Sequence, residues 1–167
     1  AKAKYWLPRV REVARGLPER DFLLIRHDVD ITPWAALRMA ELERDEGVTS
    51  TYYYRLHAPF YNLMDGAVLD SVKAVAAMGH EVGLHNDLIT LALATRRQPG
   101  EFLEQIVEAF TARGIPLRGS VAHGSRTCRA LGYMNYQIFE EFRDAPVAPD
   151  YRDRPELFER FVEPQVE

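Results

Sequence analysis

Ionisable side chains interrupt an apolar run early in the chain, where LLIR is followed at once by His27, Asp28, Val29 and Asp30. Two carboxylates this close repel each other, so a nearby cation or a bound metal ion is expected to stabilise them. Side chains alternate between the faces of a strand, so Asp28 and Asp30 start on the same face. One could therefore ligate a metal ion while the other takes a proton from water.

Short apolar runs alternate with amphipathic stretches along the chain. We predict strands at 22–26, 48–55, 80–85 and 119–123, and helices at 33–46, 67–78, 101–113 and 135–142. Thr32 and Asp65 are the expected N-caps, and Gly47, Gly79 and Gly114 the expected stops. This alternation predicts an α/β fold with βα units and a parallel sheet. Four strands are too few to close a barrel, and a full (β/α)₈ barrel takes about 250 residues, so the sheet is open or belongs to a longer domain.

Four of the five histidines fall at or just after the C-terminal end of a predicted strand, whereas His80 begins a strand and is expected to be structural. The residues that we expect at this edge of the sheet are Arg26, His27, Asp28, Asp30, Arg55, His57, His85, Asp87 and His123. In parallel α/β folds, ligands bind and catalysis takes place at this edge. Imidazoles with a carboxylate suit Zn²⁺ or a similar divalent ion, and a catalytic zinc site has three protein ligands and an open position.

The composition is that of a globular protein, with 167 residues, 47% hydrophobic and 28% charged. The net charge of -4 and scattered basic residues argue against nucleic-acid binding, and no apolar run approaches the ~20 residues of a membrane span. A single cysteine, Cys128, excludes an intrachain disulfide. The N-terminus lacks the apolar core of a secretion signal, so we expect a cytoplasmic location. Exposed edges of an unfinished sheet would favour a homo-oligomer.

Each of these features also has a structural interpretation. The segment Asp28–Asp30 alone could be a turn with side-chain hydrogen bonds, and His57 could simply pack in a loop. Arg26 could serve only to pair with Asp28. The three tyrosines at 52–54 fit core and sheet positions better than a platform for sugars, and nothing around Cys128 marks it as a nucleophile.

Four segments together, FLLIRHDVDITP, STYYYRLHAPFYN, GHEVGLHND and SVAHGS, resemble the polysaccharide deacetylase-like proteins of the NodB-homology superfamily, from about Asp21 to Phe142. The resemblance implies a distorted (β/α) barrel that removes N-acyl groups from amino sugars with a divalent metal. It implies that Asp28 is the catalytic base and that Asp30 binds the metal.

The sequence departs from this family at two places. The family has a pair of histidines four residues apart after the third strand; here His85 fits, but Ile89 stands at the second position. Either another group replaces that ligand, with His123 preferred and Asp87 second, or the site binds no metal. The family also has a catalytic-acid histidine on a late strand, and no histidine follows His123. Residues 1–167 are therefore expected to be a single domain of this type, incomplete at its C-terminal side.

The resulting hypothesis is a metal-dependent hydrolase acting on a carbohydrate or another small acylated substrate. Asp28 would activate water, Asp30, His85 and His123 would hold the metal, zinc by preference, and Arg26 would orient Asp28. Arg55, His57 and Asp87 are the expected substrate contacts. A catalytically impaired carbohydrate-binding pseudoenzyme is the alternative.

A third class follows from DVDIT, which also resembles the DxDx[TV] segment of haloacid-dehalogenase-type phosphatases. That interpretation predicts a Ser or Thr ending the second strand, and it leaves the histidines unexplained.

Overall fold

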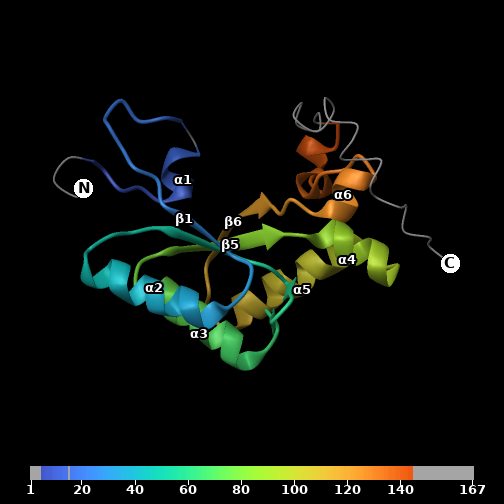
Figure 1. The fold of residues 1–167 in the computed structure, drawn as a ribbon, viewed down its shortest axis with the longest axis horizontal. Helices are drawn as coiled ribbons and strands as arrows, with labels where there is room; N and C mark the ends of the chain where they lie inside the picture. Colours follow the sequence, from blue (N-terminus) through green and yellow to red (C-terminus); the bar gives the residue numbers. More distant parts are fainter. Residues whose placement is uncertain (1–4, 15, 145–167) are drawn as a thin grey trace. The chain divides into compact units, whose positions relative to one another are not determined.

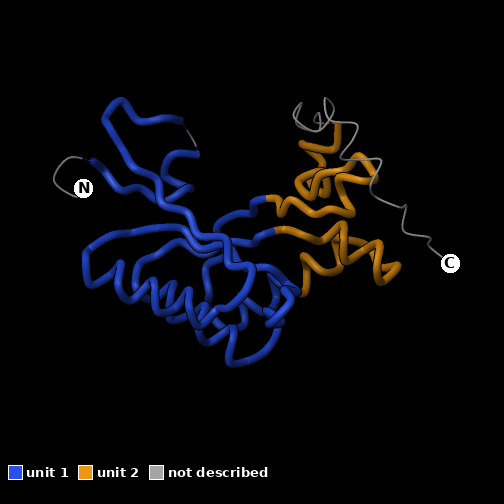
Figure 2. The backbone as a smooth tube through the Cα atoms, in the orientation of Figure 1, with its two compact units in different colours: residues 1–85, 106–121 blue, residues 86–105, 122–167 orange. Residues whose placement is uncertain are grey.

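The computed structural model describes residues 5–14 and 16–144, so the segment from Ala145 onward, for which we predict no element, lies outside the described residues. The chain divides into two compact units (Figure 2). Unit 1 comprises residues 1–85 and 106–121, and unit 2 comprises residues 86–105 and 122–167. The prediction of a single domain stays a prediction.

Strands and helices alternate along the chain (Figure 1). The strands are β1 (Arg26–Val29), β2 (Thr51–Tyr54), β3 (His57–Ala58), β4 (Tyr61–Asn62), β5 (Glu81–Asn86) and β6 (Leu117–Ala122). The α-helices are α1 (Val10–Val13), α2 (Pro33–Asp45), α3 (Gly66–Ala77), α4 (Leu88–Thr95), α5 (Pro99–Ala112) and α6 (Arg126–Ala130). Two short 3₁₀ helices follow, η1 (Asn135–Ile138) and η2 (Glu140–Phe142), where we predict one continuous helix.

The main sheet has the strand order β1-β2-β5-β6, and β1 pairs parallel with β2, as does β2 with β5. Strands β3 and β4 form a separate antiparallel pair. The predicted α/β fold with a parallel sheet of βα units is confirmed. Parallel pairing brings the carboxyl ends of the strands to one edge.

The predicted limits of the first strand are wrong. It spans Arg26–Val29 rather than 22–26, while Phe22 makes an isolated bridge with Trp6. Leu23 and Leu24 are exposed at 44% and 37%, so the apolar run is not the buried strand. A strand can continue through ionisable residues when its side chains find polar partners on both faces, which Arg26 and His27 do.

The helix boundaries follow the predicted signals closely. Helix α2 begins at Pro33 after Thr32, and Gly47, Gly79 and Gly114 have positive φ angles of 61°, 95° and 65° just after the helices. Glycine adopts this conformation at low cost, so it ends a helix effectively. Helix α4 has no counterpart in the prediction, because its sequence LITLALAT is apolar almost all round and shows no helical periodicity.

In unit 1, helices α2 and α3 pack against each other and cover one face of the sheet, and α1 lies on the other face (Figure 1). The covered face carries Tyr52, Tyr54, Val82 and Leu84, all at most 1% exposed. The prediction that the three tyrosines belong to the core and sheet is confirmed. No helix within the described residues is long and apolar enough to cross a membrane.

Candidate functional site

The register of the sheet aligns three residues that are far apart in the sequence. Asp28 pairs with Tyr53, and Tyr53 pairs with Gly83, so these three form one row across β1, β2 and β5. Two residues further along each strand stand Asp30, Arg55 and His85. Because side chains two apart share a face, these three continue on the same face at the carboxyl edge.

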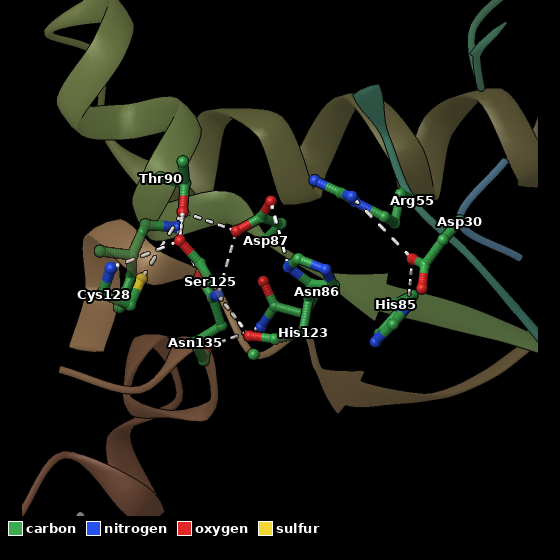
Figure 3. Close-up of polar contacts among 12 residues, drawn as sticks. Asp30, Arg55, His85, Asn86, Asp87, Thr90, His123, Ser125, Cys128 and Asn135 are labelled. Atoms are coloured by element: carbon green, nitrogen blue, oxygen red, sulfur yellow. Dashed lines mark hydrogen bonds and ion pairs between the residues drawn. The ribbon is translucent and has the colours of Figure 1, made fainter. Parts of the chain in front are cut away.

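His85 is the centre of this group, which we call the acidic cluster: Asp28, Asp30 and His85, with Arg26 and Arg55 beside them. Its Nδ1 lies 3.1 Å from Oδ1 of Asp30, and its Nε2 lies 3.7 Å from Oδ2 of Asp28. The His85 side chain is 5% exposed, whereas those of Asp28 and Asp30 are 29% and 42% exposed. The imidazole is thus fixed in the protein interior, while both carboxylates remain accessible. Figure 3 shows Asp30 between Arg55 and His85.

Each carboxylate of the cluster also has an arginine. Arg26 donates from Nε to Oδ1 of Asp28 at 2.8 Å and from Nη2 to Oδ2 at 2.5 Å, a two-pronged pair. Nη1 of Arg55 lies 3.9 Å from Oδ1 of Asp30. These two cations offset part of the repulsion between the acids.

Gly83 gives this face its shape. A Cβ atom at Gly83 would lie 2.4 Å from the ring of Tyr53, so only glycine lets the ring lie over β5. Burial raises the pKa of Tyr53 to about 12, so its hydroxyl stays protonated. The aromatic ring therefore forms an uncharged floor beside Asp28.

The donor set of the cluster fits a divalent ion in part. Two ligands of a tetrahedral zinc ion are about 3.3–3.5 Å apart, given bonds of about 2.0–2.2 Å. The 3.1 Å between Asp30 Oδ1 and His85 Nδ1 is close to this separation. Within the described residues, no group of three or more His, Cys, Asp or Glu side chains is arranged as a complete metal site. The separation of Asp30 and His85 is therefore compatible with two ligands of one ion.

A cavity of about 490 Å³ borders the first strand. It is lined by residues 27–32, by Tyr52 and by Ala35, Ala36 and Met39 of α2, so it borders the α2 side of β1, and His85 is not part of its lining. The lining includes both acids and the apolar Val29 and Ile31. Such a mixture of a few polar groups and apolar walls is common in binding sites for small molecules.

His27 does not lie with the acids, although we predict it at the same edge. It points to the opposite face of β1, where its Nε2 lies 2.7 Å from Oε1 of Glu43. Ser50 and Tyr52 donate to Oε2 of Glu43 at 2.6 Å and 2.7 Å. Burial opposes the charged form of Glu43, but these hydrogen bonds lower its pKa below the usual range. Together with His80, these residues form what we call the Glu43 network.

His80 has the structural role that we predict. It is 5% exposed, its Nδ1 lies 3.0 Å from Oγ of Ser50, and its Nε2 lies 3.0 Å from the carbonyl oxygen of Ala40. Burial lowers its pKa, so the neutral imidazole is favoured. The sequence signal for this network is an acid on the buried face of a helix: Glu43 follows Ala36 and Ala40 at helical spacing, and both alanines are buried.

Unit 2 contains Asp87 and His123, which we predict as substrate and metal contacts. His123 Nδ1 lies 3.4 Å from Oδ2 of Asp87. Thr90 donates to Asp87 at 2.6 Å, and Asn135 Nδ2 donates to the same oxygen at 3.2 Å (Figure 3). Asp87 is 7% exposed. A carboxylate beside one ring nitrogen orients a histidine so that the other nitrogen can bind a metal or carry a proton.

Hydroxyl and thiol groups surround this pair in unit 2. Thr90 also contacts Ser125 at 2.7 Å and the sulfur of Cys128 at 3.6 Å. Ser125 caps α6 by accepting from the amide of Cys128. Burial raises the pKa of the Cys128 thiol, which is 1% exposed, so it is a poor nucleophile. Sequence reasoning missed Thr90, Ser125 and Asn135, because uncharged polar residues carry no distinctive spacing.

The structure thus brings together Arg26, Asp28, Asp30, Arg55 and His85 in unit 1, and Asp87 and His123 in unit 2. His57 is different: it is exposed, and the described residues give its side chain no hydrogen bond or ion pair. Its role as a substrate contact stays a prediction.

Comparison of the chain with protein-family models, with curated proteins and with solved structures gave no match.

Proposed function

We propose that the chain carries the catalytic groups of a metal-dependent hydrolase that removes N-acyl groups from amino sugars or a related polysaccharide. The observation that carries the proposal is the position of His85, whose two ring nitrogens face Asp28 and Asp30 at 3.7 Å and 3.1 Å. An imidazole with carboxylates at the carboxyl edge of a parallel sheet is a common basis for metal-assisted hydrolysis.

The residues divide the work by their contacts. Asp30 and His85 hold the ion, since their donor atoms are as close as two ligands of one metal. Asp28 takes the proton from the attacking water, and Arg26 fixes the orientation of its carboxylate through two hydrogen bonds. When bound, the divalent ion, zinc by preference, polarises the acyl carbonyl and lowers the pKa of water. The assignment of His123 as the third ligand rests on the sequence alone and stays a prediction.

The winding of the sheet supports a barrel of the deacetylase type. The strand order β1-β2-β5-β6 proceeds in one direction along the chain, and the long helices α2 and α3 lie on one face, with the four-residue α1 on the other (Figure 1). Doubly wound sheets instead reverse their order and place helices on both faces. An incomplete (β/α) barrel is therefore the architecture that we propose.

The cavity beside β1 supports a small acylated substrate. Its volume of about 490 Å³ is in the range of ligand pockets, about 300–1,000 Å³. Val29, Ile31 and Met39 offer apolar surface for an acyl group at the edge of β1, and Asp28 and Asp30 belong to the same lining. Arg55, which is half-buried beside Asp30, is the proposed contact for a substrate oxygen.

The decisive experiment measures zinc content and acyl release together. Protein purified without chelator is analysed for zinc, and acetate release is followed with oligosaccharides of N-acetylated amino sugars. We expect Asp28→Asn to keep zinc and lose turnover, and His85→Ala to lose both. Asp45→Asn is the matched control, since it removes an aspartate paired with a neighbouring arginine on the surface of α2.

Other outcomes would contradict the proposal in different ways. A zinc-free protein that binds the oligosaccharide without acyl release would identify a carbohydrate-binding pseudoenzyme. Magnesium-dependent hydrolysis of a phosphate ester, with phosphate on Asp28, would identify the phosphatase class. That class needs a Ser or Thr at the end of the second strand, and β2 ends in Tyr54 followed by Arg55.

A further inference from the structure

Tyr61 bridges the ends of the two strands that carry the acids and Arg55. It begins β4, whose pairing with β3 forms a short hairpin after β2. Its hydroxyl donates to the carbonyl oxygen of Val29 at 2.5 Å and accepts from the amide of Arg55 at 2.9 Å. Tyr61 is 9% exposed. A single hydroxyl therefore joins β1 to β2 from outside the sheet.

The two peptide groups that Tyr61 binds adjoin the acidic cluster directly. The pairing of β1 with β2 ends at Val29 and Tyr54. The carbonyl of Val29 belongs to the peptide bond that leads into Asp30, and the bound amide is that of Arg55 itself. The Tyr61 hydroxyl thus takes the place of the next hydrogen bond of the ladder, at the point where the side chains of the cluster begin.

The hydroxyl keeps both roles over the ordinary pH range. Burial is the main cause that raises the pKa of Tyr61 to about 12. The group consequently remains protonated and can donate and accept at once. Buried hydrogen bonds with both partners satisfied hold a backbone rigidly, because breaking them leaves buried peptide groups unpaired.

We propose that Tyr61 is a positioning residue of the acidic cluster: its hydroxyl fixes the backbone of Asp30 and Arg55, and so sets the placement of the Asp30 carboxylate beside His85. The inference rests on the proposed function in one respect, namely that Asp30 and His85 hold a divalent ion. Groups outside the ligand shell that orient ligands change metal affinity by about 10–100-fold when they are lost.

Tyr54 provides a matched control in the same unit. It is 0% exposed, and its hydroxyl has no hydrogen-bond partner among the described residues. Tyr54→Phe and Tyr61→Phe each delete one buried hydroxyl and keep the ring. They differ in the hydrogen bonds lost, which are two for Tyr61. The comparison of the two variants therefore distinguishes the effect of deleting a buried hydroxyl from the effect of losing the hydrogen bonds from Tyr61 to Val29 and Arg55.

The first measurement is the affinity for Zn²⁺, by competition with a chromophoric chelator, together with the visible spectrum of the Co²⁺ form. We expect Tyr61→Phe to weaken Zn²⁺ binding about tenfold and to alter the Co²⁺ bands. Tyr54→Phe should stay within about twofold of the wild type. Equal affinities and spectra in the two variants would overturn the proposal.

The second measurement uses the metal-free protein, so that it still decides if the wild type binds no metal and the proposed function fails. The ¹⁵N chemical shifts of the His85 ring at one fixed pH report which nitrogen carries the proton beside Asp28 or Asp30. A change in Tyr61→Phe and none in Tyr54→Phe supports positioning. Unchanged His85 signals in both variants overturn it, whatever the metal binding. Urea unfolding of each variant checks that both are compared as folded proteins.

Discussion

The two faces of the sheet in unit 1 use the same strands for opposite purposes. On one face, Asp28, Asp30 and His85 approach one another at 3.1–3.7 Å, and both acids are partly exposed. On the other face, Glu43 accepts short hydrogen bonds of 2.6–2.7 Å from Ser50 and Tyr52, and its side chain is 12% exposed. Adjacent residues of β1, His27 and Asp28, belong to different faces.

The difference lies in how far the carboxylates are exposed to solvent, at 12% for Glu43 against 29% for Asp28 and 42% for Asp30. Glu43 has short partners at both oxygens, so it fixes α2 on the sheet and has little capacity for a ligand. His85 instead has acids at longer range on both sides. Carboxylates that are accessible to solvent can approach a ligand, whereas a buried network with short hydrogen bonds stabilises the fold.

Removal of the Glu43 carboxylate should have the largest effect on stability. Glu43→Ala leaves Ser50 and Tyr52 without their acceptor and is expected to lower the free energy of unfolding by about 3 kcal/mol. Urea denaturation measures this change. Glu41→Ala, which removes an acid that pairs with Arg38 on the surface of the same helix, should cost no more than about 0.5 kcal/mol. Similar decreases in the free energy of unfolding for Glu43→Ala and Glu41→Ala would show that the Glu43 network stabilises the protein no more than a surface ion pair does.

Removal of the Asp30 charge from the acidic cluster should change zinc affinity much more than it changes stability. Asp30→Asn is expected to weaken Zn²⁺ binding about 100-fold or more, because a charged ligand is lost. The free energy of unfolding should change by less than about 1 kcal/mol, because the Asp30 side chain is 42% exposed and its neutralisation also relieves repulsion with Asp28. Calorimetric zinc titration and urea denaturation test both statements. A large loss of stability with unchanged zinc affinity would show that Asp30, like Glu43, stabilises the fold and does not bind the ion.

The sequence predicts the acidic cluster better than it predicts the Glu43 network on the opposite face of the sheet. Helix limits and the parallel sheet follow from local signals, namely Pro33, the stop glycines and the alternation of apolar runs. The nearness of Asp30 and His85 follows from parallel pairing alone. The face on which His27 lies does not follow from the sequence, because it depends on the residue at which β1 begins. A shift of the strand by one residue moves every side chain to the other face.

Hydrogen bonds over long sequence distances are the other feature that remains hidden in the sequence. The position of Tyr61 depends on a hairpin with two-residue strands, and nothing in RLHAPFYN marks such short strands. The contact of Asn135 with Asp87 joins residues 48 positions apart. Only the folded chain shows which uncharged polar groups meet.

The pH dependence of stability should be a property of the Glu43 network. Burial lowers the folded-state pKa of His80 below its unfolded value, so folding favours the neutral ring. Its contribution is fully present above the unfolded pKa of about 6.5 and is lost as the pH falls toward the folded pKa. Unfolding free energies measured between pH 7.5 and 5 should therefore decrease toward acid. His80→Gln should flatten this dependence; an unchanged slope would assign it to other groups.

The smallest effect on stability is expected from removal of the ion pair between Arg26 and Asp28. Arg26 and Asp28 form two hydrogen bonds, but their side chains are 42% and 29% exposed. Solvent and salt screen such pairs, so Arg26→Gln should change the free energy of unfolding by only about 0.5 kcal/mol, and less in 1 M NaCl. Turnover should respond more strongly than stability, because Asp28 loses the group that orients it. If Arg26→Gln instead lowers stability as much as Glu43→Ala, and leaves turnover intact, the pair is structural and the two faces serve the same purpose.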